Sequence, residues 1–123
     1  MKNIVEVNGI KCYAYHGCLP EEEKIGGNYL VDIKITTDFS ASFTSDELTD
    51  TVDYVVINKI VEEEMAIRSK LIEHVGNRIL QRLKKELSNV QEVYIKVTKI
   101  CPPIDGDVDD VAIVIQSESE GGE

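Results

Sequence analysis

The sequence lacks the paired cysteines that a disulfide framework or a structural zinc site would need. Its three cysteines, Cys12, Cys18 and Cys101, are odd in number, and no two of them are spaced as C-x-x-C. Disulfide-rich domains usually carry even numbers of cysteines, and zinc ribbons carry C-x-x-C pairs. The cysteine usage therefore indicates a reduced, cytosolic protein.

Histidine is equally scarce, because only His16 and His74 occur in the chain. Three histidines cannot meet around one metal ion within such a chain, so we expect structural or hydrogen-bonding roles for both. The spacings support neither a Ser-His-Asp nor a Cys-His catalytic arrangement. No glycine-rich phosphate loop occurs either, since Gly26-Gly27 is an isolated pair. We therefore predict no metal and no cofactor.

Positive charge is also in short supply. The chain has 13 lysine and arginine residues against 23 aspartate and glutamate residues, which gives a net charge of -10. Such a surface repels phosphate backbones and anionic lipids, so nucleic acid and membrane are poor partners. No apolar run approaches the length of a membrane span or resembles a signal peptide. We expect a cytoplasmic protein with a single domain at 1–117 and a polar, disordered tail at 118–123.

Alternation of apolar and polar residues predicts four strands. The odd positions from 28 to 40 are mostly apolar, which is typical of a half-buried antiparallel strand. Residues 4–15, 93–98 and 111–116 are strand-like as well, with a bulge or bend expected at Asn8-Gly9, where the phase changes. The segment YHGCLPEEEKIGGN between the first two strands is too long for a tight hairpin and is predicted to be a loop.

Two segments with helical periodicity, 51–68 and 70–87, separate the second strand from the third. Ser69 is the expected N-cap of the second helix. Their apolar stripes are Ile57, Ile60, Val61 and Met65 in the first helix and Ile72, Val75, Ile79, Leu83 and Leu87 in the second. The order of elements predicts an α+β fold in which two helices cover one face of a four-stranded antiparallel sheet. Its open edges favour a ring of subunits that continues the sheet.

Lys99 interrupts the apolar face of the third strand. Counting by two from Val93 to Val97 places its side chain among apolar residues, where lysine is rare without a partner or a purpose. A desolvated lysine is a usable acid, base or Schiff-base amine, whereas the alternative is a side chain that reaches water at the strand end. Pro102 and Pro103 are expected to keep the preceding residue extended and to fix the turn, in a cis or a trans form.

Glu73 and Tyr54 are two further candidates. Glu73 falls in the first turn of the second helix, where a carboxylate either faces water or accepts two parallel hydrogen bonds from an N-C-N edge, such as that of a pterin or guanine. Tyr54, at the start of the first helix, either transfers a proton or simply packs. Spacing alone does not choose between these roles.

Four segments resemble the dihydroneopterin aldolase family in order and spacing. They are YHGCLPEEEKIGGNYLVDI, DTVDYVVI, LIEHVGNRI and KICPPI, and they extend over nearly the whole chain. The resemblance implies the tunnelling fold, in which four subunits close a ring-shaped barrel and two rings stack into a homo-octamer. It implies active sites between neighbouring subunits.

The resemblance also implies a reaction of folate (tetrahydrofolate) biosynthesis. In it 7,8-dihydroneopterin undergoes retro-aldol cleavage to 6-hydroxymethyl-7,8-dihydropterin and glycolaldehyde. The N5=C6 imine of the substrate accepts the electron pair of the broken bond, so neither a metal nor a lysine imine is required. Reversal after rotation of the bound aldehyde implies 2'-epimerase activity as well.

Carried over by position, the resemblance assigns catalysis to Lys99, Tyr54 and Glu22. Lys99 would be the general acid/base near the side chain and N5 of the substrate, and Glu22 would lie beside it. Tyr54 would come from the adjacent subunit and help to protonate the intermediate.

The substrate-binding residues implied by the resemblance are Glu73, Ile72, Val52, Tyr54 and Glu22. Glu73 would bind the amino and amide nitrogens of the pterin, and backbone groups near the other positions would line the ring. Asp53, where the family varies, is assigned no role.

Two alternative functions are left open. An epimerase of dihydroneopterin triphosphate would act on a multiply charged substrate, which a chain with a net charge of -10 suits poorly. A non-catalytic module that binds pterin or purine would keep Glu73 but lack the chemistry, and the presence of Lys99, Tyr54 and Glu22 argues against it.

Overall fold

Four antiparallel strands form one sheet in the order β1-β2-β3-β4, so that each strand pairs with its neighbours in sequence. In the computed structural model, which describes residues 1–118, the strands are β1 (Asn3–Ala14), β2 (Gly27–Thr37), β3 (Glu92–Ile100) and β4 (Asp110–Glu118). The four predicted strands are thus confirmed, with ends that differ by a few residues. The predicted tail at 118–123 lies outside the described residues except for Glu118, the last residue of β4.

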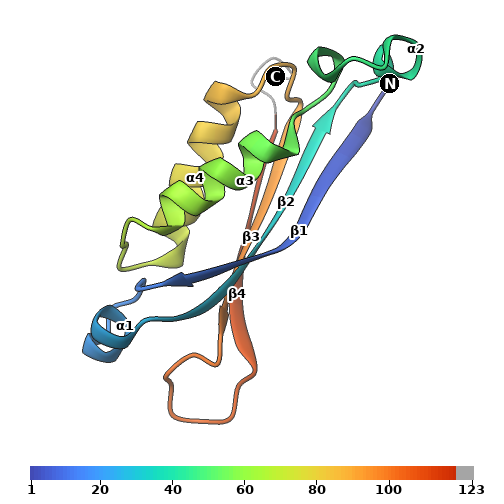
Figure 1. The fold of residues 1–123 in the computed structure, drawn as a ribbon. Coiled ribbons are helices and arrows are strands. Elements are labelled where there is room, and N and C mark those ends of the chain that lie inside the picture. The colour runs from blue at the N-terminus through green and yellow to red at the C-terminus, as the bar shows by residue number, and fades with distance from the viewer. Residues whose placement is uncertain (119–123) are drawn as a thin grey trace.

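Two long helices, α3 (Tyr54–Met65) and α4 (Ile72–Glu86), cover one face of the sheet (Figure 1). The predicted helices at 51–68 and 70–87 are therefore confirmed with tighter bounds, and so is the α+β class. Three short elements were not predicted: α1 (Pro20–Ile25), α2 (Ser42–Ser45) and the 3-10 turn η1 (Leu48–Asp50). Six residues or fewer are too few to show a helical period.

The bulge expected at Asn8-Gly9 is confirmed. The register between β1 and β2 shifts between Val7 and Ile10, and Gly9 takes a φ of 67°. Its N–H donates to the carboxylate of Asp32 at 2.7 Å instead of to the strand ladder. Because one extra residue changes the phase of the strand, the apolar residues on both sides of the bulge face the same core.

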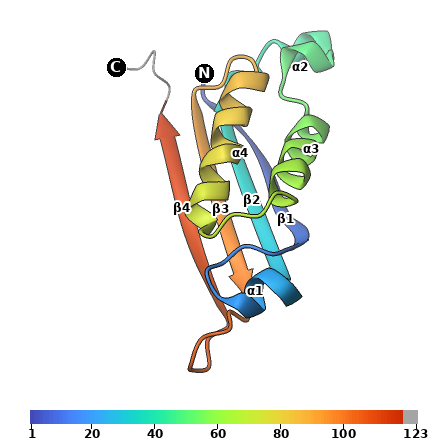
Figure 2. The ribbon, with the colours of Figure 1, turned by 90° about the vertical axis from the view of Figure 1, so that its left-hand side faces the viewer.

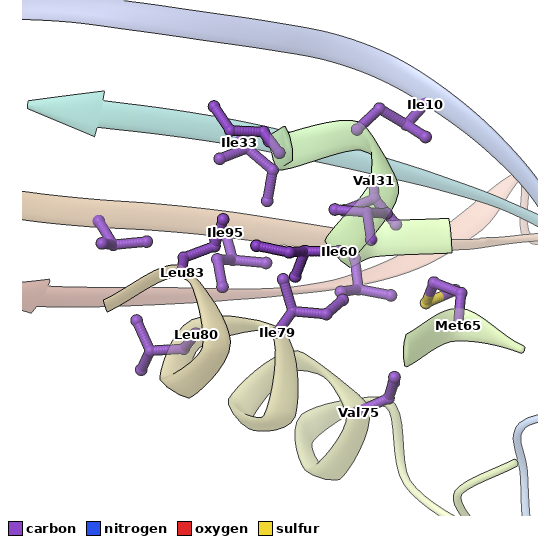
Figure 3. Close-up of a cluster of buried hydrophobic side chains, with 14 of the residues drawn as sticks. Ile10, Val31, Ile33, Ile60, Met65, Val75, Ile79, Leu80, Leu83 and Ile95 are labelled. Carbon is purple, nitrogen blue, oxygen red and sulfur yellow. The ribbon is translucent and has the colours of Figure 1, made fainter. Parts of the chain in front are cut away.

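The core lies between the helices and the sheet (Figure 3). The buried residues of α3 are the four that its periodicity predicts. α4 adds Gly76 and Leu80 to its predicted stripe, whereas Leu87 is only partly buried. From the sheet come Val31, Ile33, Ile35, Val93, Ile95 and Val97, all nearly inaccessible to solvent. Burying an aliphatic side chain of this size stabilises a fold by about 1.5–3 kcal/mol. The strand ends near α1 are therefore attached to a well-packed layer.

Candidate active site

Lys99 lies near the end of β3, on the face that the helices cover. It pairs with Tyr29 of β2 and Val111 of β4, and it continues the row of buried residues that includes Val97. Its side chain is 17% exposed, and Nζ donates to Oε2 of Glu22 in a close ion pair. The predicted position on the apolar face is confirmed. The amine ends on a mostly buried carboxylate and not in open water.

The Glu22 carboxylate is held from several sides. It belongs to the first turn of α1, which begins at Pro20, and its Oε1 accepts a hydrogen bond from the Leu19 N–H at 3.2 Å. The carboxylate lies against Gly17, because a Cβ atom at that position would come within 2.2 Å of Glu22 Cδ. Gly17 also has a φ of 137°, which favours glycine. The backbone at Gly17 and Leu19 therefore fixes the position of the Glu22 carboxylate that binds Lys99.

A cleft of about 180 Å³ opens beside the Lys99–Glu22 pair. Its lining residues are Glu21, Glu22, Ile25, Gly26, Gly27, Tyr29, Lys99, Ile100, Cys101 and Pro103. Typical small-molecule sites have volumes of about 300–1,000 Å³ and bury most of their ligand. The cleft of one chain is smaller than this, so it can enclose only part of a substrate.

Glu73 lies outside this cleft but at the same end of the molecule. It is exposed in the first turn of α4, whereas the neighbouring Ile72 is 7% exposed and belongs to the core. The loop that precedes α4 contacts the loop that precedes α1, for example through a hydrogen bond of 3.0 Å from Gly17 N to Ser69 O. Glu73 thus presents a carboxylate at a helix start, close in space to α1.

Tyr54 and Val52 lie far from Lys99 within the chain. Tyr54 is the first residue of α3 and is 65% exposed, and Val52 is 5% exposed in the core. The start of α3 lies beside α2 and η1, at the opposite end of the sheet from α1 (Figures 1 and 2). One chain therefore brings Lys99 and Glu22 together but does not bring Tyr54 to them. Asp53 is the N-cap of α3, where Oδ1 accepts from Val55 N at 2.9 Å.

Ser69 is not the N-cap of α4, which corrects the prediction. The N-cap is Leu71, without a side-chain hydrogen bond, and Ser69 is buried two residues earlier. Its hydroxyl accepts from Arg78 Nη1 at 2.7 Å and lies 2.7 Å from Nδ1 of His74. Two side chains of α4 itself therefore occupy the hydroxyl that local preference would assign to a backbone N–H at the helix start.

Cys101 also departs from expectation. It precedes Pro102 but has a φ of 47°, in the left-handed region, and its N–H donates to the Asp109 carbonyl at 2.8 Å. The hydrogen bond continues the pairing of β3 with β4 while the chain turns away. The peptide bonds before Pro102 and Pro103 are both trans. A left-handed residue other than glycine costs about 1–3 kcal/mol, so surrounding contacts impose this turn next to Lys99.

His16 and Tyr29 form a buried pair behind Lys99. The Tyr29 hydroxyl donates to the His16 carbonyl at 2.7 Å, and the two rings meet edge to face. Burial raises the pKa of the Tyr29 phenol to about 12, and the negative charge of Glu22 adds to the rise. Burial lowers the pKa of the His16 imidazole to about 4, and the positive charge of Arg78 acts in the same direction. At neutral pH both side chains therefore stay uncharged.

Folding stability is expected to decrease in mild acid because of His16. The unfolded chain binds a proton on this residue near pH 6.5, whereas the folded chain resists it until about pH 4. Between these values the unfolded state binds more protons, so stability falls as pH falls, by roughly 3 kcal/mol at most. Urea unfolding of the protein and of His16→Asn at pH 7, 5.5 and 4 measures the effect. Equal slopes against pH in both proteins would contradict it.

The structure describes residues 1–118. Within that range no three His, Cys, Asp or Glu side chains form a group able to hold a metal ion. Over the same range no helix is long and apolar enough to cross a membrane. The expectation that the reaction proceeds without a metal stays a prediction.

Comparison with known proteins identifies relatives of the whole chain. A sequence model of the family described as dihydroneopterin aldolase matches residues 5–116. A dihydroneopterin aldolase of Staphylococcus epidermidis is 38% identical over 121 residues, covering 98% of this chain and 100% of that protein. This degree of identity over the full length indicates common descent and not only a common fold.

Solved structures match the fold closely. Escherichia coli dihydroneopterin aldolase in complex with neopterin has a TM-score of 0.86 at 22% identity, over 94% of this chain and 98% of that one. A dihydroneopterin aldolase of Burkholderia thailendensis bound to guanine has a TM-score of 0.76 at 16% identity, over 97% and 93% of the two chains. The tunnelling fold that the family resemblance implies is thus confirmed for the single subunit.

Proposed function

The chain belongs to the dihydroneopterin aldolase family and is a carbon-carbon lyase of folate biosynthesis, and we propose that Lys99, Glu22 and Glu73 carry its reaction on 7,8-dihydroneopterin. The single observation that supports this assignment is the ion pair of Lys99 with Glu22. An amine and a carboxylate, both largely removed from water, face a cleft that is open to a ligand. Groups in such surroundings are suited to proton transfer.

The chemistry requires two proton transfers. A base removes the proton of the 2'-hydroxyl, the bond between C1' and C2' breaks, and glycolaldehyde leaves. The electron pair moves into the N5=C6 imine of the substrate, and the resulting enamine is protonated on carbon to give the hydroxymethyl product. Lys99 provides the acid/base group, and Glu22 keeps the amine oriented toward the cleft. Reversal of the cleavage accounts for the proposed 2'-epimerase activity.

Glu73 is proposed to hold the pterin ring. Its carboxylate is exposed at the start of α4, so it is free to accept two parallel N–H bonds from the amino and amide nitrogens. The E. coli and B. thailendensis relatives were solved with neopterin and with guanine, which share this N-C-N edge. Backbone groups near Ile72 would line the ring on the same side.

A second subunit is proposed to complete each site. Tyr54 is exposed at the opposite end of its own chain from Lys99, and the cleft beside Lys99 is too small for a whole substrate. A neighbouring chain that brings its Tyr54 and Val52 to this cleft would supply the missing wall. We therefore propose a homo-oligomer, a tetrameric ring or an octamer, with active sites between subunits.

The cysteines support a cytoplasmic location, which is also a proposal. Cys12, Cys18 and Cys101 are all free thiols, as is usual in a reducing compartment.

Incubation with 7,8-dihydroneopterin in excess EDTA is expected to release glycolaldehyde and 6-hydroxymethyl-7,8-dihydropterin at the rate seen without chelator. The reason is that the substrate supplies its own electron sink. Chromatography of the pterins and a carbonyl assay of the aldehyde measure both products. Strict metal dependence would contradict this mechanism, and pterin binding without aldehyde release would indicate a binding module. Faster epimerisation of the triphosphate than cleavage of the free compound would indicate the epimerase.

A further inference from the structure

Two loops meet at the end of the molecule that carries Lys99, and each leads into a site residue. Residues 15–19 join β1 to α1 and lead to Glu22, whereas residues 66–71 join α3 to α4 and lead to Glu73. The elements from α1 to α3, including all of β2, separate the two loops in the sequence. The spacing of the two carboxylates therefore depends on the contacts that hold the loops together.

Hydrogen bonds join these loops directly. Gly17 N donates to Ser69 O at 3.0 Å, and Ser69 N donates to Nδ1 of His16 at 2.9 Å. The Arg68 guanidinium donates to two carbonyls of the first loop, from Nε to Tyr15 O at 3.0 Å and from Nη2 to Gly17 O at 2.7 Å. We refer to His16, Gly17, Arg68 and Ser69 as the loop clasp. Its bonds reach both the N–H and the carbonyl of Gly17.

His16 is the buried centre of the clasp. Because Nδ1 accepts the N–H of Ser69, the neutral ring carries its proton on Nε2. The ring is fully buried, and Nε2 makes no well-formed hydrogen bond among the described residues, although the Met65 backbone favours the protonated ring. A buried N–H that is poorly paired destabilises a fold, and an apolar side chain would avoid that cost. What the histidine adds is the acceptor that binds the second loop.

The loop clasp holds the backbone that positions the Glu22 carboxylate. The carboxylate of Glu22 lies against Gly17, and its Oε1 accepts a hydrogen bond from the N–H of Leu19 in the same loop. Since the clasp bonds Gly17 on both sides, a shift of Arg68 or Ser69 moves the surface on which the carboxylate rests. The Lys99 amine moves with the Glu22 carboxylate, because it donates a hydrogen bond to it.

We propose that the loop clasp sets the spacing between the Glu22–Lys99 pair and the Glu73 carboxylate, so that Arg68 and His16 are positioning residues of the reaction. This inference rests on the roles proposed above for Glu22, Lys99 and Glu73. A misplacement of about 1 Å can lower a rate by about a hundredfold, even when no reacting group is lost. Arg68 thus acts on turnover through Glu22, while Glu73 keeps its affinity for the ring.

The test is a double-mutant cycle between Arg68 and Glu22. Arg68→Met is expected to lower kcat about tenfold or more, with little change in the Kd of pterin, which has the ring but no side chain. Arg68→Lys should restore part of kcat, because an ammonium group can still donate to a loop carbonyl. In the Glu22→Gln background, Arg68→Met should cost little more, because the group through which it acts has already changed.

Two further comparisons separate positioning from general stability. His16→Asn keeps an acceptor near the place of Nδ1 and should retain more kcat than His16→Leu, at matched unfolding temperatures. Arg82→Met removes an arginine of α4 that is paired with Glu63, Glu64 and Glu86, and it should leave kcat unchanged. Sedimentation verifies that each variant has the same assembly as the parent protein.

Three outcomes would overturn the inference. They are full kcat in Arg68→Met, losses in the double variant that multiply, and equal loss of turnover and of pterin affinity. A failure of the proposed function gives different results from a failure of this inference. In that case the parent protein releases no glycolaldehyde, or Glu22→Gln keeps full activity.

Discussion

Replacement of Lys99 by methionine is expected to lower kcat by roughly a thousandfold, within the range of about 10²–10⁴ that a general acid or base contributes. Methionine keeps the length and the apolar contacts of the side chain, so β3 and the core beneath it should stay intact. The amine that donates to Glu22 and faces the cleft is lost. Single-turnover conversion of 7,8-dihydroneopterin measures the change. Titration of pterin fluorescence should show a nearly unchanged Kd.

A matched control is available on the same strand. Lys96 lies on the opposite face of β3, where its partner in the register with β2 is Asp32. Lys96→Met therefore removes the same charge without changing the cleft. Its kcat should match that of the parent protein. Borohydride trapping of substrate carbon on Lys99 would contradict the acid/base role, because a stable adduct requires an imine. Equal activities of Lys99→Met and Lys96→Met would do so as well.

Replacement of Glu73 by glutamine is expected to raise the Kd of pterin by roughly a hundredfold or more, because two charge-assisted hydrogen bonds contribute about 1.5–3 kcal/mol each. Glutamine offers one acceptor, and it places an N–H group opposite a donor of the ring. The value of kcat/KM should fall in parallel, because the lost hydrogen bonds stabilise the bound substrate and the transition state alike. Equilibrium fluorescence titration and initial rates measure the two quantities.

Glu86 offers the control for Glu73. It is the last residue of α4 and is paired with Arg82, so Glu86→Gln changes the charge of the same helix at its far end. Its pterin affinity should equal that of the parent protein. If Glu73→Gln binds pterin as tightly as Glu86→Gln does, the ring is held elsewhere.

Periodicity predicted the scaffold well because burial is repeated along each element. The inward residues of α3, the alternation of β2 and the bulge at Gly9 all follow from which side chains avoid water. The inward position of Lys99 follows from the same count. Its charge does not disturb the strand because one residue in a long apolar row leaves the period intact.

The partner of Lys99 could not be derived in this way. Glu22 lies in a segment with no apolar period, and α1 is only six residues long. Which of three consecutive glutamates turns inward depends on the fit of one carboxylate against Gly17, a contact between residues that no repeat connects. Only the resemblance to a family placed Glu22 beside Lys99. The structure now shows that pair directly.

Local rules failed where other contacts compete with them. Ser69 has the side chain of an N-cap, but it packs with His74 and Arg78, and Cys101 takes a left-handed conformation before proline. The contacts of Arg68 with the first loop could not be foreseen, because an arginine between two helices is usually a solvated residue.

The distance between Tyr54 and Lys99 within one chain affects how substitutions are to be interpreted. If neighbouring chains share each site, a change at the start of α3 would look harmless on a single-chain map, because the Lys99–Glu22 pair lies toward the other end of the sheet. It would nevertheless impair the chemistry of the adjacent subunit. A genetic screen that ranks positions by their proximity to Lys99 in one chain would then miss the site residues that the neighbouring chain supplies.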